Sequence, residues 1–342
     1  MELRQLGVPV EHYDIRRTDV RPVIEMMGKT AFQGRNLARA AEIAAKMIED
    51  SSCAILLTLA GSLISAGQRA VLAELLRCNA VDAIVSTGAN IVDQDFFEAL
   101  GFRHFQGDIR ADDQALREVH IDRIYDTYID EDALRVCDDT VREIADGLPP
   151  GAYSSRQFIA QMGRYLADRN LGEDSLVALA YRLGVPIFVP AFSDCSAGFG
   201  LVAHQVAHPD RHVSIDSVRD FRELTMLKVW HGRTGLLMLG GGVPKNFVQD
   251  VVVSAEVLGY PAEMHAYAVQ LTVADERDGA LSGSTLREAN SWGKVGLAHE
   301  QMVFGEMTVT LPLLAGYIYH SGGWRSRSPR RWSDLLAQRL GD

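Results

Sequence analysis

The residue with the clearest chemical potential is Lys294, which closes the segment Ser291-Trp292-Gly293-Lys294. A lysine attacks carbonyl or imine carbon only as the neutral amine, a form that desolvation or a neighbouring cation favours. Trp292 would give this lysine an apolar wall. Taken alone, however, the segment is explained more simply by an ordinary surface lysine.

Three short loops of small residues suggest a second kind of chemistry, the binding of phosphate. They are Gly61-Ser62-Leu63-Ile64-Ser65, Ser86-Thr87-Gly88-Ala89 and Gly240-Gly241-Gly242. Backbone N–H groups in such a loop, at the start of a helix, bind phosphate. None of the loops matches a Walker A sequence or a strict Gly-x-Gly-x-x-Gly. Each one alone is more simply a tight turn, and only their recurrence makes a nucleotide cofactor an equal alternative.

An acidic run at 275–278, followed by Gly279 and later by Glu288, precedes the lysine. A solvated loop is the simpler interpretation of this run. The functional alternative is recognition of an amine or of a cofactor ribose. The run by itself therefore assigns no binding site.

Three histidines at 204, 208 and 212 have the spacing of one helix face. Pro209 interrupts a helix through all three, and no acid nearby in the sequence completes a set of metal ligands. We therefore expect no metal site. A hydrolase triad is also unsupported, because the chain has no Gly-x-Ser-x-Gly elbow.

The scaffold that positions these residues is predicted to be a parallel α/β sheet. Apolar runs at 53–60, 83–86, 185–190 and 235–239 alternate with small-residue loops and helical patterns. Runs without polar interruption are typical of strands buried on both faces. We expect a Rossmann-like, doubly wound sheet with helices on both faces, and ligands at the carboxyl ends of its strands.

The chain is predicted to form a single domain over residues 1–342 with three distinct segments. Residues 1–50 would form a lead-in and a helix, clearest at 36–48. Residues 101–172 would form an added, mostly helical connecting region, in which 122–132 is an acidic connection. Residues 321–342, with several arginines among serines, would form an exposed basic tail.

The composition restricts the class of protein. With 342 residues, 47% of them hydrophobic and 23% charged, the chain can bury a large core and is not disordered. A net charge of −11 argues against a nucleic-acid-binding surface. Four scattered cysteines without zinc spacing fit reduced thiols. No apolar run approaches about 20 residues, and the first residues lack a signal-peptide pattern, so we expect a cytoplasmic protein without a membrane partner.

Several segments, in this order, resemble the deoxyhypusine synthases. These enzymes move an aminobutyl group from spermidine to a lysine of a translation factor. The resemblance runs from about Tyr13 to Ala315 and is carried by residues 30–36, 63–67, 189–194, 215–216, 239–245, 282–283 and 288–294. The triple glycine and the segment from Glu288 to Lys294 are specific, and they replace the surface-lysine interpretation with a catalytic one.

The resemblance implies NAD as the cofactor and a transfer in four steps. A hydride passes from the polyamine to NAD and leaves an imine, and the active-site lysine captures the aminobutyl group as an enzyme imine. An acceptor amine then displaces the lysine, and the hydride returns. The cofactor is not consumed, so it must stay beside the lysine, and water must be excluded because imines hydrolyse.

Matching positions imply a role for individual residues. Lys294 would be the covalent residue, and the substrate positions would be Glu288, Trp292, Asn246, Gly279, Asp93 and Gln94. The positions facing NAD would be Gly61, Ser62, Leu63, Ile64, Ser65, Thr87, Gly88, Ala89, Asp194, Gly241, Val273, Ala274, Glu306 and Met307. The family also implies a homotetramer with sites between paired subunits.

The departures from the family predict altered recognition of the amine. Asn246 stands in place of a substrate histidine, and Gln94 in place of a glutamate. Phe199 and Leu281 stand in place of aspartates. Each lost partner of a charged amine costs about 1–3 kcal/mol. We therefore expect a changed donor or acceptor, such as a small amine instead of a protein lysine, with homospermidine synthesis as the nearest known reaction.

Two other functions remain open. An NAD-dependent amine dehydrogenase would use the same hydride step but release NADH. A non-catalytic relative would bind a nucleotide or an amine and act through assembly. Loss of the substrate histidine favours this last alternative, whereas retention of Trp292-Gly293-Lys294 argues against it.

Overall fold

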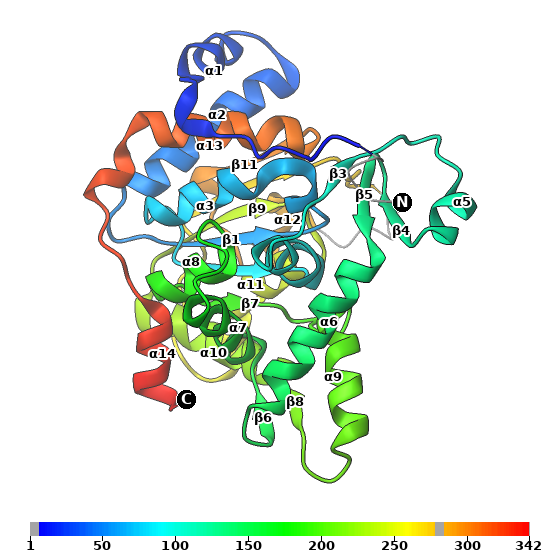
Figure 1. The fold of residues 1–342 in the computed structure, drawn as a ribbon. Helices are drawn as coiled ribbons and strands as arrows, with labels where there is room; N and C mark the ends of the chain where they lie inside the picture. Colours follow the sequence, from blue (N-terminus) through cyan, green and yellow to red (C-terminus); the bar gives the residue numbers. More distant parts are fainter. Residues whose placement is uncertain (1–6, 278–283, 342) are drawn as a thin grey trace.

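The computed structural model describes residues 7–277 and 284–341, and its centre is a six-stranded parallel sheet (Figure 1). The strand order is β11-β10-β9-β1-β2-β7. The strands are β1 (Ala54–Leu59), β2 (Ala83–Ser86), β7 (Ile187–Phe188), β9 (Thr234–Leu239), β10 (Tyr267–Thr272) and β11 (Glu300–Phe304). Leu59 pairs with Ser86 on one side and Leu239 on the other, so these strands end at one edge of the sheet.

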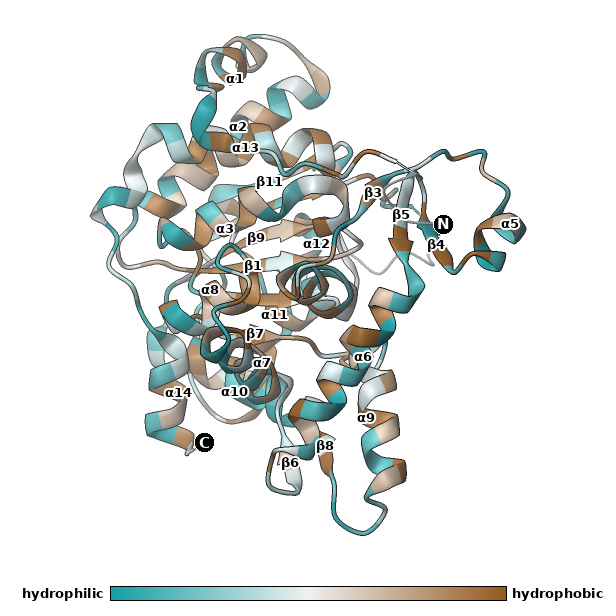
Figure 2. Cartoon of the chain, viewed as in Figure 1, coloured by the Kyte–Doolittle hydropathy of each residue, from teal (hydrophilic) through white to brown (hydrophobic). Residues whose placement is uncertain are grey.

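Helices cover both faces of this sheet, which confirms the doubly wound prediction. Side chains alternate along β1: Ile55 and Leu57 belong to one buried cluster and Leu56 to another. The first cluster lies under α2 (Phe32–Glu49), α3 (Arg69–Arg77) and α13 (Met307–Ser321), and the second under α10 (Ser217–His231), α11 (Gly242–Val257) and α14 (Trp332–Leu340). Figure 2 shows the strands as largely hydrophobic between helices whose outer sides are hydrophilic.

The order in which the chain adds strands reverses between β1 and β9, although the strands themselves are parallel. From β1 the chain builds outward through β2 to β7, and it then returns to β9 and builds through β10 to β11 on the other side. Loops that follow β1 and β9 therefore lead to helices on opposite faces. Such a reversal leaves a crevice at the carboxyl ends of the strands, where open α/β sheets bind ligands.

Predicted strands and helices agree with the structure except where proline or an unusual helix intervenes. The run at 185–190 gives only the two-residue β7, because Pro186 and Pro190 have no N–H to donate to a sheet. The helical segment after β2 begins as the π-helix η4 (Ala89–Phe96) and continues as α4 (Phe97–Ala99).

Residues 101–172 contain an antiparallel sheet that the sequence analysis missed. The predicted acidic connection at 122–132 is wrong, because this stretch forms the hairpin of β4 (Ile121–Ile124) and β5 (Thr127–Asp130). Tyr128 and Ile129 are buried, whereas the acids face solvent. The remaining elements here are β3 (Phe105–Gln106), α5 (Asp113–Glu118), α6 (Glu131–Asp146), β6 (Gly151–Tyr153) and α7 (Ser155–Asp168).

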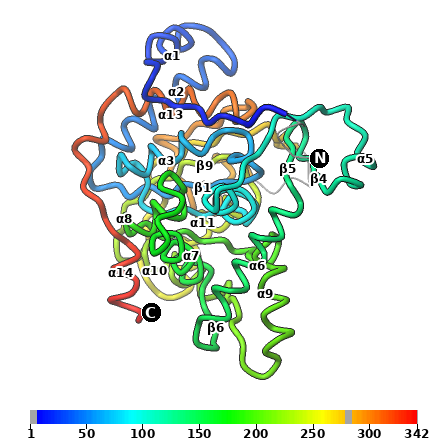
Figure 3. The backbone as a smooth tube through the Cα atoms, in the orientation of Figure 1, coloured from blue at the N-terminus to red at the C-terminus, as the bar shows by residue number. Residues whose placement is uncertain are grey.

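Other elements complete the fold around the sheet. Long helix α6 packs along α9 (Ser196–Ala207), and the two project away from the sheet (Figure 3). The chain also forms η2 (Ile15–Arg17), α1 (Arg21–Gly28), η3 (Ile64–Gln68), α8 (Leu176–Leu183), β8 (Val213–Ile215), α12 (Leu286–Ser291), η5 (Leu297–His299) and η6 (Gly323–Ser326). No helix in the described ranges is long and apolar enough to cross a membrane.

The basic tail expected to be exposed at 321–342 is partly buried over the residues that the structure describes. Arg327 is buried and its Nη2 lies 2.7 Å from Oδ2 of Asp82, which also accepts a hydrogen bond from the backbone N–H of Ile55. Trp332 and Leu336 of α14 are buried in the cluster beneath α10. The arginine-rich composition of this segment predicted solvent exposure. The guanidinium of Arg327 instead pairs with the buried carboxylate of Asp82, which directly precedes β2.

Arg327→Ala would remove the closer of the two guanidinium groups at the buried Asp82 and leave it only Arg330, at 3.5 Å, and the N–H of Ile55. Breaking a buried pair from one side costs about 3–5 kcal/mol, so we expect a loss of that order in the free energy of unfolding, measured by urea denaturation. Arg211→Ala, at an exposed position before β8, should change it by less than about 0.5 kcal/mol. Equal stability of the two variants would contradict a structural role for the Arg327–Asp82 pair.

Candidate functional site

The residues predicted to face a nucleotide all follow strands of the central sheet at the same edge. Residues 61–65 follow β1, 87–89 follow β2, Gly241 follows β9, 273–274 follow β10 and 306–307 follow β11. The loops also touch one another. A Cβ on Gly240 would lie 2.8 Å from Cβ of Ala60 and 3.6 Å from Cε of Met307. A Cβ on Gly88 would clash with Cys195, directly after Asp194. The structure thus gathers these positions at the crevice.

Asn90 organises the loops after β1 and β2. Its Oδ1 accepts a hydrogen bond from the N–H of Leu63 at 2.8 Å, and its Nδ2 donates to the carbonyl of Gly61 at 2.9 Å and to Oγ1 of Thr87 at 3.0 Å. The side chain is completely buried. Sequence analysis assigned no role to Asn90, because its role depends on two loops that only the sheet brings together.

Both of these loops lead into π-helical turns. Oε1 of Gln94 in η4 accepts a hydrogen bond from the N–H of Ser65 in η3 at 2.9 Å. Gln94, predicted at the substrate, is 1% exposed and supports the loop after β1. Gly67 has φ of 82° within η3, a conformation that favours glycine. π-Helical turns are rare in proteins, and those that form often lie at functional sites.

The triple glycine forms the turn from β9 into α11. Gly240 has φ of 82°, and its close approach to Ala60 leaves no room for a side chain. Gly241 precedes the first turn of α11, a helix of 16 residues. Unpaired N–H groups and the dipole at such a helix start favour an anion. This end of α11 is therefore suited to a phosphate group.

Lys294 lies in a turn after α12, with its backbone N–H bonded to the carbonyl of Ala289. Its Nζ lies 2.5 Å from Oδ1 of Asp250 in α11 and 5.4 Å from the ring centre of Trp292. The lysine side chain is 15% exposed. The apolar wall expected from Trp292 is in place, whereas the acidic partner Asp250 was not anticipated.

A second lysine, Lys245, lies in the first turn of α11 and is fully buried. Its Nζ donates to the backbone carbonyl of Ser284. Desolvation lowers the pKa of Lys245 to about 8, opposed by the charge of Glu288 and assisted by that of Lys294. Sequence analysis included Lys245 in the triple-glycine segment but gave it no role. The burial of Lys245 sets it apart from an ordinary lysine, and the sequence motif could not predict that burial.

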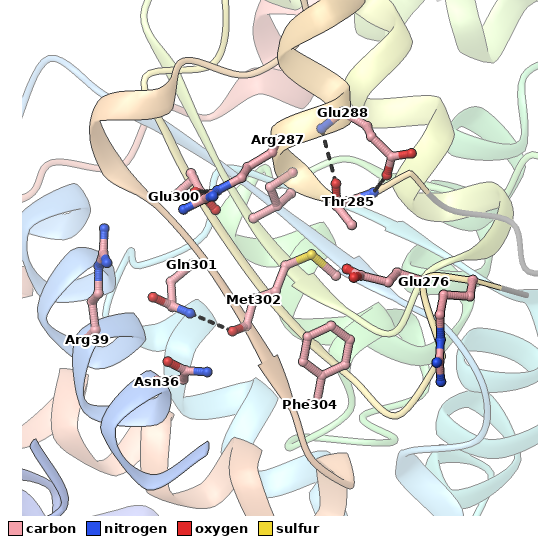
Figure 4. Close-up of a pocket in the computed structure, with 12 residues that line it drawn as sticks. Asn36, Arg39, Glu276, Thr285, Arg287, Glu288, Glu300, Gln301, Met302 and Phe304 are labelled. Carbon is pink, nitrogen blue, oxygen red and sulfur yellow. Dashed lines mark hydrogen bonds and ion pairs between the residues drawn. The ribbon is translucent and has the colours of Figure 1, made fainter. Parts of the chain in front are cut away.

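Glu288 caps the start of α12 in the structure. Its Oε2 accepts a hydrogen bond from the N–H of Thr285 at 2.6 Å, and Oγ1 of Thr285 accepts one from the N–H of Glu288. These bonds lower the pKa of Glu288. The residue also lines a cavity of about 630 Å³, in which Arg287 pairs with Glu300 (Figure 4). Gly279, predicted at the substrate, and Leu281, predicted to replace an aspartate, lie outside the described residues.

A second cavity, of about 430 Å³, is lined in part by Asp250, the carboxylate that pairs with Lys294. Its lining comes from the loop after β7, from α10 and from α11: Pro190, Ser217, Val218, Phe221, Val243, Asn246, Phe247 and Asp250. Asn246, which replaces the family's histidine, stands one helical turn before Asp250 on the same face. The expected substrate position therefore opens onto a cavity next to Lys294.

Asp93 lies in η4 and Phe199 in α9, two elements that pack against each other. Oδ1 of Asp93 accepts a hydrogen bond from the N–H of Ser196 at 2.7 Å, so the acid supports the start of α9. Burial raises the pKa of Asp93 to about 6. Phe199 is 69% exposed. The structure thus divides the predicted substrate residues into one group around Lys294 and another around α9.

His204 and His208 lie beside Asp146 of α6, an acid that is distant from them in the sequence. Nδ1 of His204 lies 2.6 Å from Oδ1 of Asp146, and Nε2 accepts a hydrogen bond from the N–H of Val213. Because Nε2 accepts, Nδ1 carries the proton and donates to the carboxylate. Both ring nitrogens are therefore engaged, and the cluster is best explained as a clip between α6 and α9.

Comparison with known proteins gives one consistent result. The family model described as deoxyhypusine synthase matches residues 22–318. A deoxyhypusine synthase-like protein of Chlorobaculum parvum is 63% identical over 97% of this chain and 95% of its own length, and one of Coxiella burnetii is 60% identical over 96% and 93%. A probable deoxyhypusine synthase 2 of Methanosarcina mazei is 39% identical over 90% and 89%. The solved structure of a putative deoxyhypusine synthase from Entamoeba histolytica has a TM-score of 0.59 at 19% identity, over 91% of this chain and 97% of that one.

Asp93→Asn should change the pH dependence of stability. The folded-state pKa of Asp93, about 6, exceeds the ordinary value of 3.8. The stability associated with its protonated form is therefore present below pH 3.8 and is lost as the pH rises through about 6. Relative to wild type, the melting temperature of Asp93→Asn should rise between pH 4 and pH 7. A difference that is constant over this range would contradict the raised pKa.

Proposed function

Because the chain belongs to the deoxyhypusine synthase family, we propose that it is an NAD-dependent aminoalkyl transferase that carries the transferred group as an imine on Lys294. One observation carries the proposal. Lys294 is a shielded lysine beside Trp292, and its charge acts on Lys245 in the first turn of α11. That turn follows the triple glycine at the crevice, so the nucleophile belongs to the same edge of the sheet as the candidate cofactor loops.

The residues at the crevice fit a dinucleotide. Loops after β1, β2 and β9 meet where the strand order reverses, and the start of α11 offers N–H groups to a phosphate. Close packing of Gly240 on Ala60 keeps the floor of the crevice free of side chains. When bound there, NAD would supply the acceptor and later the donor of the hydride.

Lys294 is the residue proposed to hold the group between donor and acceptor. Its Nζ forms the bond to the aminoalkyl carbon, and a second amine later replaces it at that carbon. Trp292 shields one side of the lysine, which protects an imine from hydrolysis. Glu288 stabilises the helix that leads to this turn. Together these residues orient the nucleophile and limit the access of water.

We also propose that the amine recognised differs from spermidine. Asn246 gives the cavity beside Lys294 a neutral amide where the family has histidine, and Phe199 offers no charge to a polyamine nitrogen. Both changes favour a small amine as donor or acceptor over a protein lysine. As the family implies, we expect the transferase to act as a homotetramer.

Lys294→Arg should abolish covalent transfer. The arginine retains a positive charge beside Asp250 but is not a nucleophile. Wild-type protein incubated with NAD and a panel of amines, then reduced with borohydride, should carry a mass increment on Lys294 in peptide mass spectrometry, and Lys294→Arg should carry none. The absence of any NAD-dependent adduct on wild-type protein would overturn the transferase proposal. Free NADH accumulating with turnover would instead identify an amine dehydrogenase.

Asn90→Asp should weaken NAD binding. The carboxylate cannot donate to Gly61 and Thr87, so the two loops lose the bonds that hold them together. Loss of such bonds costs about 1–3 kcal/mol, and we expect the dissociation constant in a fluorescence titration to rise about 5- to 100-fold. Asn170→Asp, at an exposed position, serves as the control. Unchanged affinity in a folded Asn90→Asp protein would argue against NAD at this crevice.

A further inference from the structure

His265 lies just before β10, is completely buried, and has a partner on another element for each ring nitrogen. Nε2 lies 3.0 Å from the backbone carbonyl oxygen of Val248 in α11, and Nδ1 lies 2.8 Å from Oγ1 of Thr234, the first residue of β9. A carbonyl only accepts hydrogen bonds, so Nε2 carries the ring proton and donates it, and the hydroxyl of Thr234 donates to Nδ1. The ring thus joins β9 to α11 in one orientation.

A buried lysine, Lys228 of α10, fixes the direction of these hydrogen bonds. Its Nζ donates to Oγ1 of Thr234 at 2.8 Å and to the backbone carbonyl of Gly232 at 2.5 Å. Burial lowers the pKa of Lys228 to about 8, so the ammonium form predominates at pH 7. An ammonium group only donates, which leaves the hydroxyl proton of Thr234 for His265. Burial, together with the charge of Lys228, lowers the pKa of His265 and keeps its ring neutral.

The backbone of His265 holds the segment that carries Lys294. The N–H of His265 donates to the carbonyl of Lys294 at 2.9 Å, and the carbonyl of His265 accepts a hydrogen bond from the N–H of Gly296 at 2.9 Å. These two bonds form an isolated parallel bridge between His265 and Val295. Val295 is completely buried in the cluster that lies under α11. The position of the lysine backbone therefore depends on the position of residue 265.

His265 thereby connects the two elements that carry the Lys294–Asp250 pair. Its backbone holds Lys294, and its ring holds Val248, which precedes Asp250 by two residues in α11. A helix carbonyl has two lone pairs, so Val248 can accept from the ring without leaving the helix. One buried residue therefore sets where the lysine turn lies against α11. A shift of the ring would move Lys294 relative to Asp250.

We propose that His265 is a positioning residue for the nucleophile, and that its ring, held between Thr234 and Val248, fixes the Lys294 turn against α11. The inference rests on the proposed role of Lys294 in the transfer. A displacement of a reacting group by about 1 Å can reduce a rate about 100-fold. Because His265 is completely buried, it acts through the backbone of the lysine and not on the substrate. Its loss should therefore slow the covalent step without weakening amine binding.

His265→Phe tests the proposal, because the phenyl ring has nearly the shape of imidazole but makes neither hydrogen bond. With NAD and amine present, we expect the maximal rate of adduct formation on Lys294, trapped with borohydride, to fall about 10- to 100-fold at an unchanged half-saturating amine concentration. His265→Gln keeps a donor at the position of Nε2 and should restore most of the rate. His320→Phe is the control: it removes a histidine of α13 that also bonds to a backbone carbonyl, that of Ile15, and should react at the wild-type rate.

Acetylation of Lys294 by an N-hydroxysuccinimide ester gives a second readout that needs neither NAD nor an amine substrate. The reagent reacts with a neutral lysine that it can reach, and peptide mass spectrometry compares Lys294 with the exposed Lys29 in the same sample. A turn loosened from α11 opens more often, so we expect this ratio to rise at least about threefold in His265→Phe. Thr234→Val, which removes only the hydroxyl that orients the ring, should change both readouts in the same direction.

The two readouts separate this inference from the proposed function. A folded His265→Phe protein that matches wild type in either readout would overturn the positioning role, and Thr234→Val decides the question if His265→Phe does not fold. An equal loss of rate in His320→Phe would assign the effect to general destabilisation and would also overturn it. No adduct on wild type would instead refute the transferase, and the acetylation ratio would then decide the positioning role alone.

Discussion

The parallel pairing of β1 with β9 is the constraint on which the site depends. Their register, Leu59 beside Leu239, brings the loops after both strands to one edge and presses Gly240 against Ala60. The chain leaves this edge along α3 on one side and α11 on the other, which opens the crevice. Because α11 begins here, the pairing also sets the positions of Lys245, Asn246 and Asp250 along one helix.

Buried charge in this protein is compensated locally, and each compensation supports part of the site. Asp82 receives Arg327 from the end of the chain and an N–H from β1, so the tail is tied to the start of the sheet. Lys245 has a backbone carbonyl and the charge of Glu288, which offset its desolvation only in part. Asp93 has one N–H from α9. A charge buried with few partners has a shifted pKa, and two of these groups lie at proposed functional positions.

Among the described residues that separate this chain from the family pattern, Asn246 lines the second cavity, whereas Gln94 supports the loop after β1 and Phe199 lies on α9. An amide at 246 and apolar residues at 218, 221 and 247 suit a hydrocarbon chain better than a row of charges. Asp250 lines the same cavity and pairs with Lys294.

The sequence by itself determined the α/β class and the strands β1, β2 and β9, because apolar runs are local properties of the chain, and its ordered motif predicted Lys294 as the nucleophile. It also predicted which loops lie at the crevice, since parallel strands end at one edge. Only the tertiary structure decided the partners. Asn90 reaches a residue 27 positions away, and Arg327 one 245 positions away. Such pairs depend on how helices pack on the sheet, and no short-range pattern contains that information, so Asp250 and the buried tail became visible only in the fold.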